Sequence, residues 1–376
     1  MIREFKKIWS SVDFVLVASL IPLLCAGLFT MNSFTGEGNF FSKQVIWIGL
    51  SFVLFFILSN IDFHFLRKTS AIVTIFGSTC LILALLFVLG KTVKGATSWF
   101  SFGFFSFQPA DLAKIALILL LAKYFSKRHV EIANVRHIFV SGFYALILFT
   151  LVLLQPDLGS AIIIFLIWFG MVLVSGISKK HLLAVFLIGV TFFGLLWNFG
   201  FKEYQKQRIM TFIHPLADIR GAGYNAYQST VAVGSGEILG KGIGYGTQSR
   251  LNFLPEYETD FIFAAFAEEW GFIGALFLFI SFATLIFRIL YNASKGESNF
   301  EILFGIGLAI LFITHFTINV GMNIGLLPVT GIPLPFVSYG GSYLLTSFAG
   351  LGILMGMRKY ARPAHKDLMK NEFLGI

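Results

Sequence analysis

The sequence predicts an all-α polytopic membrane protein of about ten transmembrane helices, with a long outer-face loop between the seventh and eighth helices. Three observations lead to this fold class. Of the 376 residues, 57% are hydrophobic and 12% are charged, whereas soluble domains carry about 25% charged residues. Apolar stretches of about 20 residues, the length that spans a bilayer, recur along the chain. The stretch from about 200 to 260 interrupts this pattern.

The apolar stretches predict ten helices in chain order, at 14–31, 44–61, 70–89, 109–124, 138–154, 158–176, 182–199, 261–287, 302–324 and 343–357. The first stretch resembles a signal peptide, but no A-x-A cleavage motif follows it, so we expect a retained helix. Pro109, Pro156 and the prolines from 328 to 335 lie near predicted helix ends, where irregular or re-entrant backbone is possible inside protein. We treat 1–376 as a single integral membrane domain.

The distribution of positive charge predicts the orientation of these helices. The net charge is +9, and most of the 28 Lys and Arg residues fall in connections on the same side as the N-terminus. Cytoplasmic connections carry an excess of Lys and Arg. We therefore expect both termini in the cytoplasm and the loop at 200–260 on the outer face. This explanation of the charge requires no nucleic acid.

The outer-face loop is too apolar for a disordered linker. It contains Phe212, Tyr224 and Tyr227 among its polar residues, and loops longer than about 15 residues are usually functional or disordered. Its glycine-rich part, GSGEILGKGIGYG, is similar to a phosphate-binding loop. Ser235 and Gly242, however, occupy positions where that motif requires Gly and Ser or Thr. We expect this loop to pack and to take part in function, without an ATP site.

Two short motifs place charged residues at helix starts. In QPADLAK, Asp111 and Lys114 are three residues apart and so share a helix face. They form either an ion pair that locks the helix or a site where Lys114 meets an anionic ligand and Asp111 orients it. In QPDLG, Asp157 follows Pro156 at a predicted helix start. This arrangement is typical of a helix cap, and a role in ligand binding is the alternative.

The stretch FLPEYETDFIFAAFAEEWGF places five carboxylates at the start of the eighth helix. Glu268 and Glu269 lie deeper than Asp260, so we expect them to be paired inside the protein. Asp260 lies at the outer mouth of the helix and is the first candidate for a general base. An unperturbed Asp titrates near pH 4, and is therefore ionised and able to accept a proton when it is aimed at a substrate.

Together these motifs resemble the SEDS family (shape, elongation, division and sporulation), bacterial polytopic proteins that polymerise peptidoglycan. The resemblance covers nearly the whole chain, through WFSFGFFSFQPADLAK, LLQPDLGSA, YQKQRIMTFIHPLADIRGAGYNAYQS, VGSGEILGKGIGYGTQSRLNFLPEYETDFIFAAFAEEWGF and NVGMNIGLLPVTGIPLPFVSYGGS. The last motif is closer to the RodA (elongation) branch than to the FtsW (division) branch. The resemblance implies an inverting glycosyltransferase that joins lipid II into glycan strands at the outer face of the cytoplasmic membrane, releasing undecaprenyl pyrophosphate.

The resemblance also implies residue roles. Asp260 matches the essential acid of the family's TDF motif, and the matching cavity residues are Lys114, Asp111, Arg208, Asp157, Trp99 and Gln248. The chain departs from the family where Glu258 replaces His, Glu237 replaces Gly, Asp111 replaces Glu and Ser98 replaces a basic residue. The two added carboxylates near Asp260 could favour a divalent cation. No cofactor is certain, but Mg²⁺ or Mn²⁺ suits the pyrophosphate oxygens, and no metal ligands are assigned.

The implied partners are lipid II, the nascent glycan strand, membrane lipid and a class B penicillin-binding protein that crosslinks the strand. Three alternatives remain open: a transporter that flips lipid II, a paralogue of the FtsW type that acts in division, and a scaffold for partner proteins. The predicted charges gather near the outer face, whereas transporter sites lie near the membrane midplane. This placement favours the enzyme, and a scaffold would tolerate the loss of Asp260.

Overall fold

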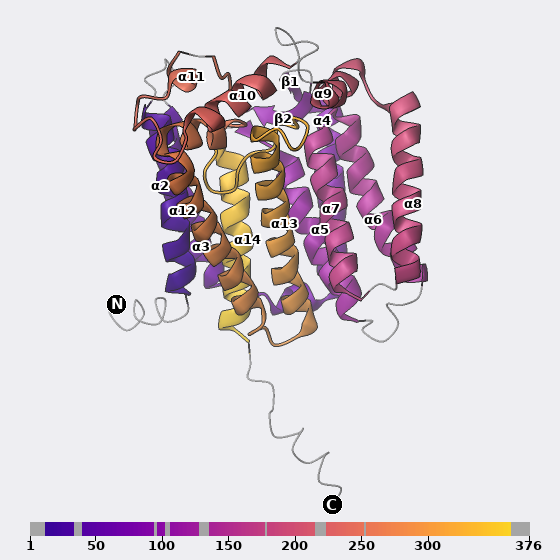
Figure 1. The fold of residues 1–376 in the computed structure, drawn as a ribbon. Helices are drawn as coiled ribbons and strands as arrows, with labels where there is room; N and C mark the ends of the chain where they lie inside the picture. Colours follow the sequence, from indigo (N-terminus) through magenta and orange to yellow (C-terminus); the bar gives the residue numbers. More distant parts are fainter. Residues whose placement is uncertain are drawn as a thin grey trace, which may run out of the picture.

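The computed structural model describes residues 12–33, 40–93, 96–101, 106–127, 135–176, 179–214, 223–251 and 253–361. All ten predicted segments are helical, and they lie side by side in one bundle (Figure 1). The ten helices are α2 (Phe14–Ser33), α3 (Phe40–Ser59), α4 (Thr69–Leu89), α5 (Pro109–Ser126), α6 (Val135–Leu154), α7 (Leu158–Val174), α8 (Lys179–Leu195), α12 (Ile262–Ala293), α13 (Asn299–Asn323) and α14 (Gly341–Lys359).

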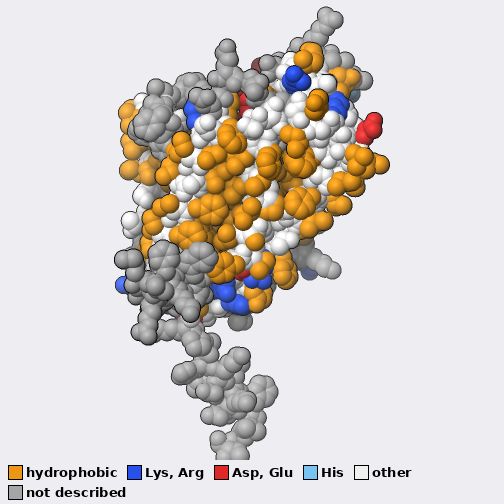
Figure 2. All heavy atoms as spheres, turned by 90° about the vertical axis from the view of Figure 1, so that its left-hand side faces the viewer, with side chains coloured by type: hydrophobic (Ala, Val, Ile, Leu, Met, Phe, Trp, Pro, Cys, Tyr) orange, Lys and Arg blue, Asp and Glu red, His pale blue; other side chains and the backbone are white. Residues whose placement is uncertain are grey.

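The exposed surface of this bundle is apolar. Among the described residues, seven helices are long and apolar enough to cross a membrane. The other three are α7, which is shorter, and α5 and α14, which include charged residues. Figure 2 shows hydrophobic side chains covering the middle of the face formed by α2, α3 and α12. Exposed large hydrophobic residues of α2 and α12 include Phe14, Ile21, Phe272 and Phe277. Surfaces of this kind are stable against lipid. The predicted class, a polytopic membrane protein, is confirmed.

One end of the bundle carries short elements that the span pattern did not predict. They are an antiparallel sheet of order β1-β2-β3 (Lys91–Val93, Ala96–Ser101 and Ser106–Phe107), the π-helical turn η2 (Leu196–Gly200), and the helices α9 (Glu203–Ile213), α10 (Tyr224–Ser235) and α11 (Thr247–Arg250). Figure 1 shows them gathered across the top of the bundle. Each is too short for a 20-residue hydropathy window to detect.

The centre of the bundle is built from α5, α7, α13 and α14. Their buried side chains form one hydrophobic core that includes Leu117, Ile164, Phe312 and Phe348. By contrast α8 stands at the edge of the bundle (Figure 1), with only 6% of its apolar window buried. A helix that is apolar on all sides is either buried in a protein core or surrounded by lipid. Because α8 is hardly buried by protein, we expect lipid around it.

The opposite end of the bundle is tied by two polar clusters. In the first, Asp13 Oδ2 accepts hydrogen bonds from Arg288 Nε (3.0 Å) and Asn292 Nδ2 (2.7 Å), which joins the start of α2 to the last turns of α12. These contacts explain why α12 runs past the predicted end at 287. The first and last described helices also begin and end on this side of the bundle (Figure 1). Arg358 and Lys359 lie in the last turn of α14, whereas the basic residues before position 12 and after position 361 lie outside the described residues.

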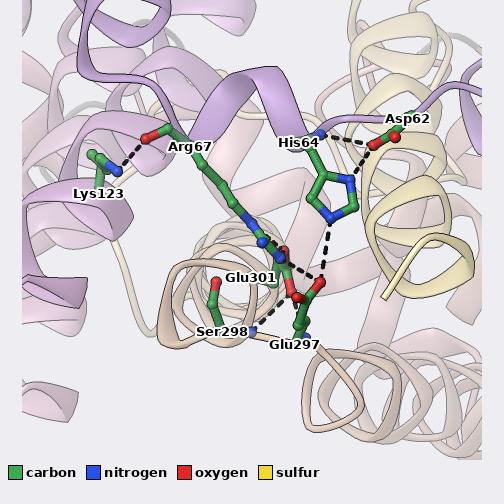
Figure 3. Close-up of polar contacts among 7 residues, drawn as sticks. All are labelled: Asp62, His64, Arg67, Lys123, Glu297, Ser298 and Glu301. Atoms are coloured by element: carbon green, nitrogen blue, oxygen red, sulfur yellow. Dashed lines mark hydrogen bonds and ion pairs between the residues drawn. The ribbon is translucent and has the colours of Figure 1, made fainter. Parts of the chain in front are cut away.

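The second cluster surrounds the 3₁₀ turn η1 (His64–Arg67), which joins α3 to α4. Figure 3 shows Arg67 between two carboxylates at the start of α13: its Nη2 lies 2.9 Å from Glu297 Oε2, and its Nε lies 3.0 Å from Glu301 Oε1. His64 Nε2 lies 3.2 Å from Glu297 Oε2. Lys123, on the last turns of α5, donates to the Arg67 carbonyl oxygen. The cluster thus joins η1 to α13 and α5.

Candidate functional site

The turn that precedes α12 is held by its main chain. Its three successive carbonyl oxygens each accept a hydrogen bond from a distant residue: Glu258 O from Tyr339 N (2.8 Å), Thr259 O from Ser338 Oγ (2.6 Å), and Asp260 O from Asn319 Nδ2 (3.0 Å) and Asn323 Nδ2 (3.1 Å). Asp260 is half-buried and lies two residues before α12, which begins at the sheet-bearing end of the bundle (Figure 1). Its Oδ2 lies 3.5 Å from the position that a Cβ atom on Gly331 would take. These contacts fix the main-chain position from which the Asp260 side chain projects.

Two asparagines on α13 supply much of this restraint, and the sequence interpretation did not identify them. Asn319 and Asn323 are fully buried. Asn319 Nδ2 also donates to Ile332 O (2.7 Å), and Asn323 Oδ1 accepts from Ala264 N (3.2 Å). A signal for them does exist in the sequence: they are polar residues four apart, on one face of an apolar span. Polar side chains inside spans are costly and are usually functional or paired.

Lys114 and Asp111 form a buried ion pair on α5. Lys114 Nζ lies 2.9 Å from Asp111 Oδ1, and each residue is only 3% exposed. Lys114 Nζ also lies 3.4 Å from His315 Nε2 of α13. Of the two open interpretations, the ion pair is the geometry that the structure shows. Binding of an anionic ligand by Lys114 stays a prediction.

Asp157 caps α7 and also holds the start of α5. Its Oδ1 accepts a hydrogen bond from Ser160 N (2.9 Å), which is the expected helix cap. Its Oδ2 accepts a hydrogen bond from Nε2 of Gln108 (2.9 Å), the residue that precedes Pro109 at the start of α5. Asp157 therefore links the two helix starts that carry the QPADLAK and QPDLG motifs.

The irregular segment 328–340 brings these residues into one site. Two of its residues contact α13: Ile332 O accepts a hydrogen bond from Asn319, and Pro333 O lies 3.4 Å from His315 Nδ1. The segment also passes close to Gly159, where an added Cβ would lie 2.8 Å from Thr330 O, and to Asp260, whose Oδ2 would lie 3.5 Å from a Cβ on Gly331. As its prolines and glycines predict, this segment is irregular and forms only turns. One segment thus contacts Asp260, the Lys114 cluster and the start of α7.

Gln248 is positioned by Glu268. This fully buried carboxylate accepts hydrogen bonds from Lys241 Nζ (2.8 Å), Thr247 Oγ1 (3.0 Å) and Gln248 N (3.1 Å). The neighbouring Glu269 Oε1 accepts from Gly244 N (2.7 Å). Glu268 and Glu269 are therefore paired internally. Within the described part of the chain, the buried Gln248 Oε1 has no hydrogen-bond partner.

The glycine-rich part of the outer loop packs against a kink in α12. Gly271 has φ +65° and ψ −164°, so the helix bends there. The two backbone amides that follow the kink bind the outer loop: Phe272 N donates to Glu237 O (2.9 Å), and Ile273 N donates to Ile238 O (3.2 Å). A Cβ on Gly240 would lie 2.1 Å from Glu269 O. The glycines here permit close backbone contact, which requires no phosphate ligand.

The two remaining predicted residues lie around this centre. Trp99 is half-buried on β2, and the adjacent Ser98 donates from its Oγ to Gln155 O (3.2 Å), two residues before Asp157. Arg208 lies on the separate helix α9 and is exposed. The structure therefore gathers Asp260, Asp111, Lys114 and Asp157 around segment 328–340. It places Trp99, Gln248 and Arg208 on neighbouring elements.

Comparison with known proteins gives one consistent result. Residues 6–363 match the family of FtsW, RodA and SpoVE proteins, described as "Cell cycle protein". The chain is 34% identical over 370 residues to "Peptidoglycan glycosyltransferase MrdB" of Escherichia coli (strain K12), covering 96% of this chain and 98% of the relative.

Two solved structures share the fold. One, described as "Structural coordination of polymerization and crosslinking by a peptidoglycan synthase complex", has a chain with TM-score 0.79 and 30% identity, covering 93% of this chain and 99% of that one. Rod shape determining protein RodA of Thermus thermophilus has TM-score 0.70 and 29% identity, covering 93% and 98%. These matches extend over nearly the full length of both partners. The chain belongs to the SEDS family, the family of FtsW, RodA and SpoVE.

Proposed function

We propose that this chain is a peptidoglycan glycosyltransferase that polymerises lipid II during cell elongation. It would act at the outer face of a bacterial cytoplasmic membrane, with both termini in the cytoplasm. One observation carries the proposal: distant residues donate four hydrogen bonds to the main chain of the turn 258–260, two of them to the Asp260 carbonyl, which fixes the position of Asp260 at the proposed outer end of the bundle. The names of its relatives MrdB and RodA support the activity and the elongation role.

The reaction is a single displacement at a sugar carbon. The 4-hydroxyl of the GlcNAc of an incoming lipid II attacks the anomeric carbon of the MurNAc at the end of the growing glycan. The new C1–O4 bond forms as the bond from C1 to the pyrophosphate oxygen breaks. Asp260 takes the hydroxyl proton, a contribution of about 10² to 10⁴ in rate. One base and one displacement convert an α-linked donor into a β-linked product, so the reaction inverts.

The leaving pyrophosphate develops negative charge that nearby cations stabilise. Arg208 is exposed on α9 and can contact the phosphates directly. Lys114 is the second nominated cation, and in the structure its charge is balanced by the buried Asp111 carboxylate. Gln248 Oε1, which has no hydrogen-bond partner among the described residues, suits a sugar hydroxyl or amide N–H. We assign Trp99 and Asp157 to substrate binding, as the family resemblance implies.

A divalent cation would depend on the substrate for most of its ligands. Among the residues described here, no three His, Cys, Asp or Glu side chains gather to hold a metal ion. Mg²⁺ and Mn²⁺ bind phosphate oxygens with few protein ligands, so pyrophosphate could bring such an ion with it. No step of the proposed reaction passes through a metal.

The lipid tails would remain in the bilayer beside the helices while the sugars react at the interface. We further propose a transpeptidase partner, a class B penicillin-binding protein, that crosslinks the new strand. The structural neighbour from a complex for polymerization and crosslinking supports this partner.

The direct test is a polymerisation assay with purified protein and fluorescent lipid II, with and without the partner and Mn²⁺. Wild type is expected to form glycan ladders, and Asp260→Asn is expected to lose at least about 10²-fold in rate. Glu203→Gln, whose side chain is 85% exposed on α9, is the matched carboxylate-to-amide control. Ladders of normal length from a stably inserted Asp260→Asn protein would refute the base assignment. Absence of ladders from wild type, with lipid II movement across liposomes, would favour the flippase instead.

A further inference from the structure

Helix α13 carries a row of three buried polar residues that faces the site. His315, Asn319 and Asn323 are spaced four residues apart and each is fully buried, so they lie on one helix face. The two asparagines bind the Asp260 and Ile332 carbonyls. His315 is the third member of the row, and the reaction described above gives it no role.

The contacts of His315 determine its tautomer. Its Nδ1 lies 3.4 Å from Pro333 O, and its Nε2 lies 3.4 Å from Lys114 Nζ. A carbonyl oxygen only accepts, so Nδ1 carries the hydrogen, and the lone pair of Nε2 then points at the ammonium group of Lys114. The ring also stacks on Tyr343, with centroids 4.7 Å apart. A neutral imidazole therefore joins the buried cation to segment 328–340.

This connection reaches the proposed base in two steps. Pro333 is two residues from Gly331, where an added Cβ would lie 3.5 Å from Asp260 Oδ2. Between them, Ile332 O is held by Asn319, one helical turn from His315. Any shift of Pro333 is therefore transmitted along a short, non-helical segment to the wall beside the carboxylate. The asparagines hold the Asp260 carbonyl, and His315 joins the neighbouring Pro333 to Lys114.

We propose that His315 is a positioning residue for glycan polymerisation. Its neutral ring accepts a hydrogen bond from Lys114 and donates one to Pro333, so the buried cation and the segment facing Asp260 keep a single relative geometry. The inference depends on the proposed function, since it assumes that Asp260 is the base. Displacement of a reacting group by about 1 Å can reduce a rate by about 10²-fold. We therefore expect loss of the His315 contacts to lower kcat and to leave KM nearly unchanged.

Three substitutions at His315 separate its two contacts. His315→Phe keeps the stacking on Tyr343 and loses both hydrogen bonds. His315→Asn places an amide N–H near the position of Nδ1, so it restores the bond to Pro333 alone. His315→Gln places an oxygen near the position of Nε2, so it restores the bond from Lys114 alone. His137→Phe is the matched control, because His137 is also buried but binds Tyr124 Oη (2.9 Å) at the opposite end of the bundle.

The experiment measures kcat and KM for lipid II polymerisation, together with thermal unfolding in detergent. We expect His315→Phe to lower kcat by about 10²-fold with KM within twofold of wild type, and the Asn and Gln variants to be intermediate. We expect His137→Phe to lower the unfolding temperature and to leave kcat unchanged. A folded His315→Phe protein with the wild-type kcat would overturn the inference.

Two further outcomes are covered by the same set of variants. If His315→Phe does not insert, the Asn and Gln variants decide: a reduced kcat in either one supports the inference, and wild-type kcat in both overturns it. Asp260→Asn is measured beside them. An active Asp260→Asn protein refutes the proposed base. An inactive Asp260→Asn protein beside a fully active His315→Phe protein refutes the positioning role alone.

Discussion

Gly331 shows how closely the backbone at the site constrains single residues. Its φ is +74°, in the left-handed region, and a Cβ added there would lie 3.5 Å from Asp260 Oδ2. A non-glycine residue in this region costs about 1–3 kcal/mol. The strain of a substitution would be relieved by movement of segment 328–340, which also binds His315 and Asn319.

We predict that Gly331→Ala reduces kcat for glycan polymerisation by up to about 10²-fold, because the segment facing the carboxylate is displaced. The matched control is Gly176→Ala. Gly176 has φ +93° and nothing within 4 Å of its added Cβ, so that variant carries similar backbone strain away from the site. Both should lose about 1–3 kcal/mol of unfolding free energy. Equal polymerisation rates in the two variants would show that Gly331 has no influence on the carboxylate.

At the scale of elements, the connections between helices are held by charge as well as by apolar packing. The η1 cluster joins the α3–α4 connection to α13 through Arg67, Glu297 and Glu301 (Figure 3). His64 takes part through Asp62 and Glu297. Its hydrogen bond with Asp62 is the largest influence and raises the pKa of His64 above its ordinary value near 6.5, and the bond with Glu297 adds to this against the effect of burial.

This raised pKa predicts how stability depends on pH. Because the folded state favours the protonated ring, the contribution of His64 is fully present below its unfolded pKa, near 6.5, and is lost as the pH rises through the higher folded-state pKa. The group is partly exposed, so we expect a loss below about 1 kcal/mol, or about 1–2 °C in the unfolding temperature. Thermal unfolding between pH 6 and 9 should show this fall in wild type and not in His64→Gln. Parallel curves for the two proteins would contradict it.

At the scale of the whole molecule, the helices α2 and α14 begin and end on the same side of the bundle, and the short elements gather on the other side (Figure 1). An even number of crossings requires this arrangement. Which side faces the cytoplasm rests on the distribution of Lys and Arg. The proposed reaction uses a lipid-linked sugar at the outer face, so the orientation matters for the function.

We predict that Glu203 faces outward and Asn299 faces the cytoplasm. Both are exposed, at the start of α9 and of α13. In a background with Cys25→Ser and Cys80→Ser, which removes both free cysteines, a membrane-impermeant maleimide should label Glu203→Cys in intact spheroplasts. Asn299→Cys should be labelled only after permeabilisation. The reverse pattern would place the proposed base on the cytoplasmic side and exclude the reaction with outward-facing lipid II.

The sequence by itself determined the class, the ten helices and the family. A bilayer-spanning helix must satisfy its backbone internally and present about 20 apolar residues to lipid, so its signal is local and needs no knowledge of neighbours. Asp260, Asp111, Lys114 and Asp157 were found in the same way, as charged residues at helix starts within short motifs.

Only the tertiary structure decided how these residues are arranged. The interaction of Lys114 with His315 joins positions 201 apart, and that of Asn319 with Asp260 joins positions 59 apart. No periodicity encodes such pairs. The same limit explains the kink at Gly271, where the amides of Phe272 and Ile273 donate to carbonyl oxygens of the outer loop. Local hydrophobicity selects the spans, whereas the site depends on hydrogen bonds between distant segments, which form only once the bundle has packed.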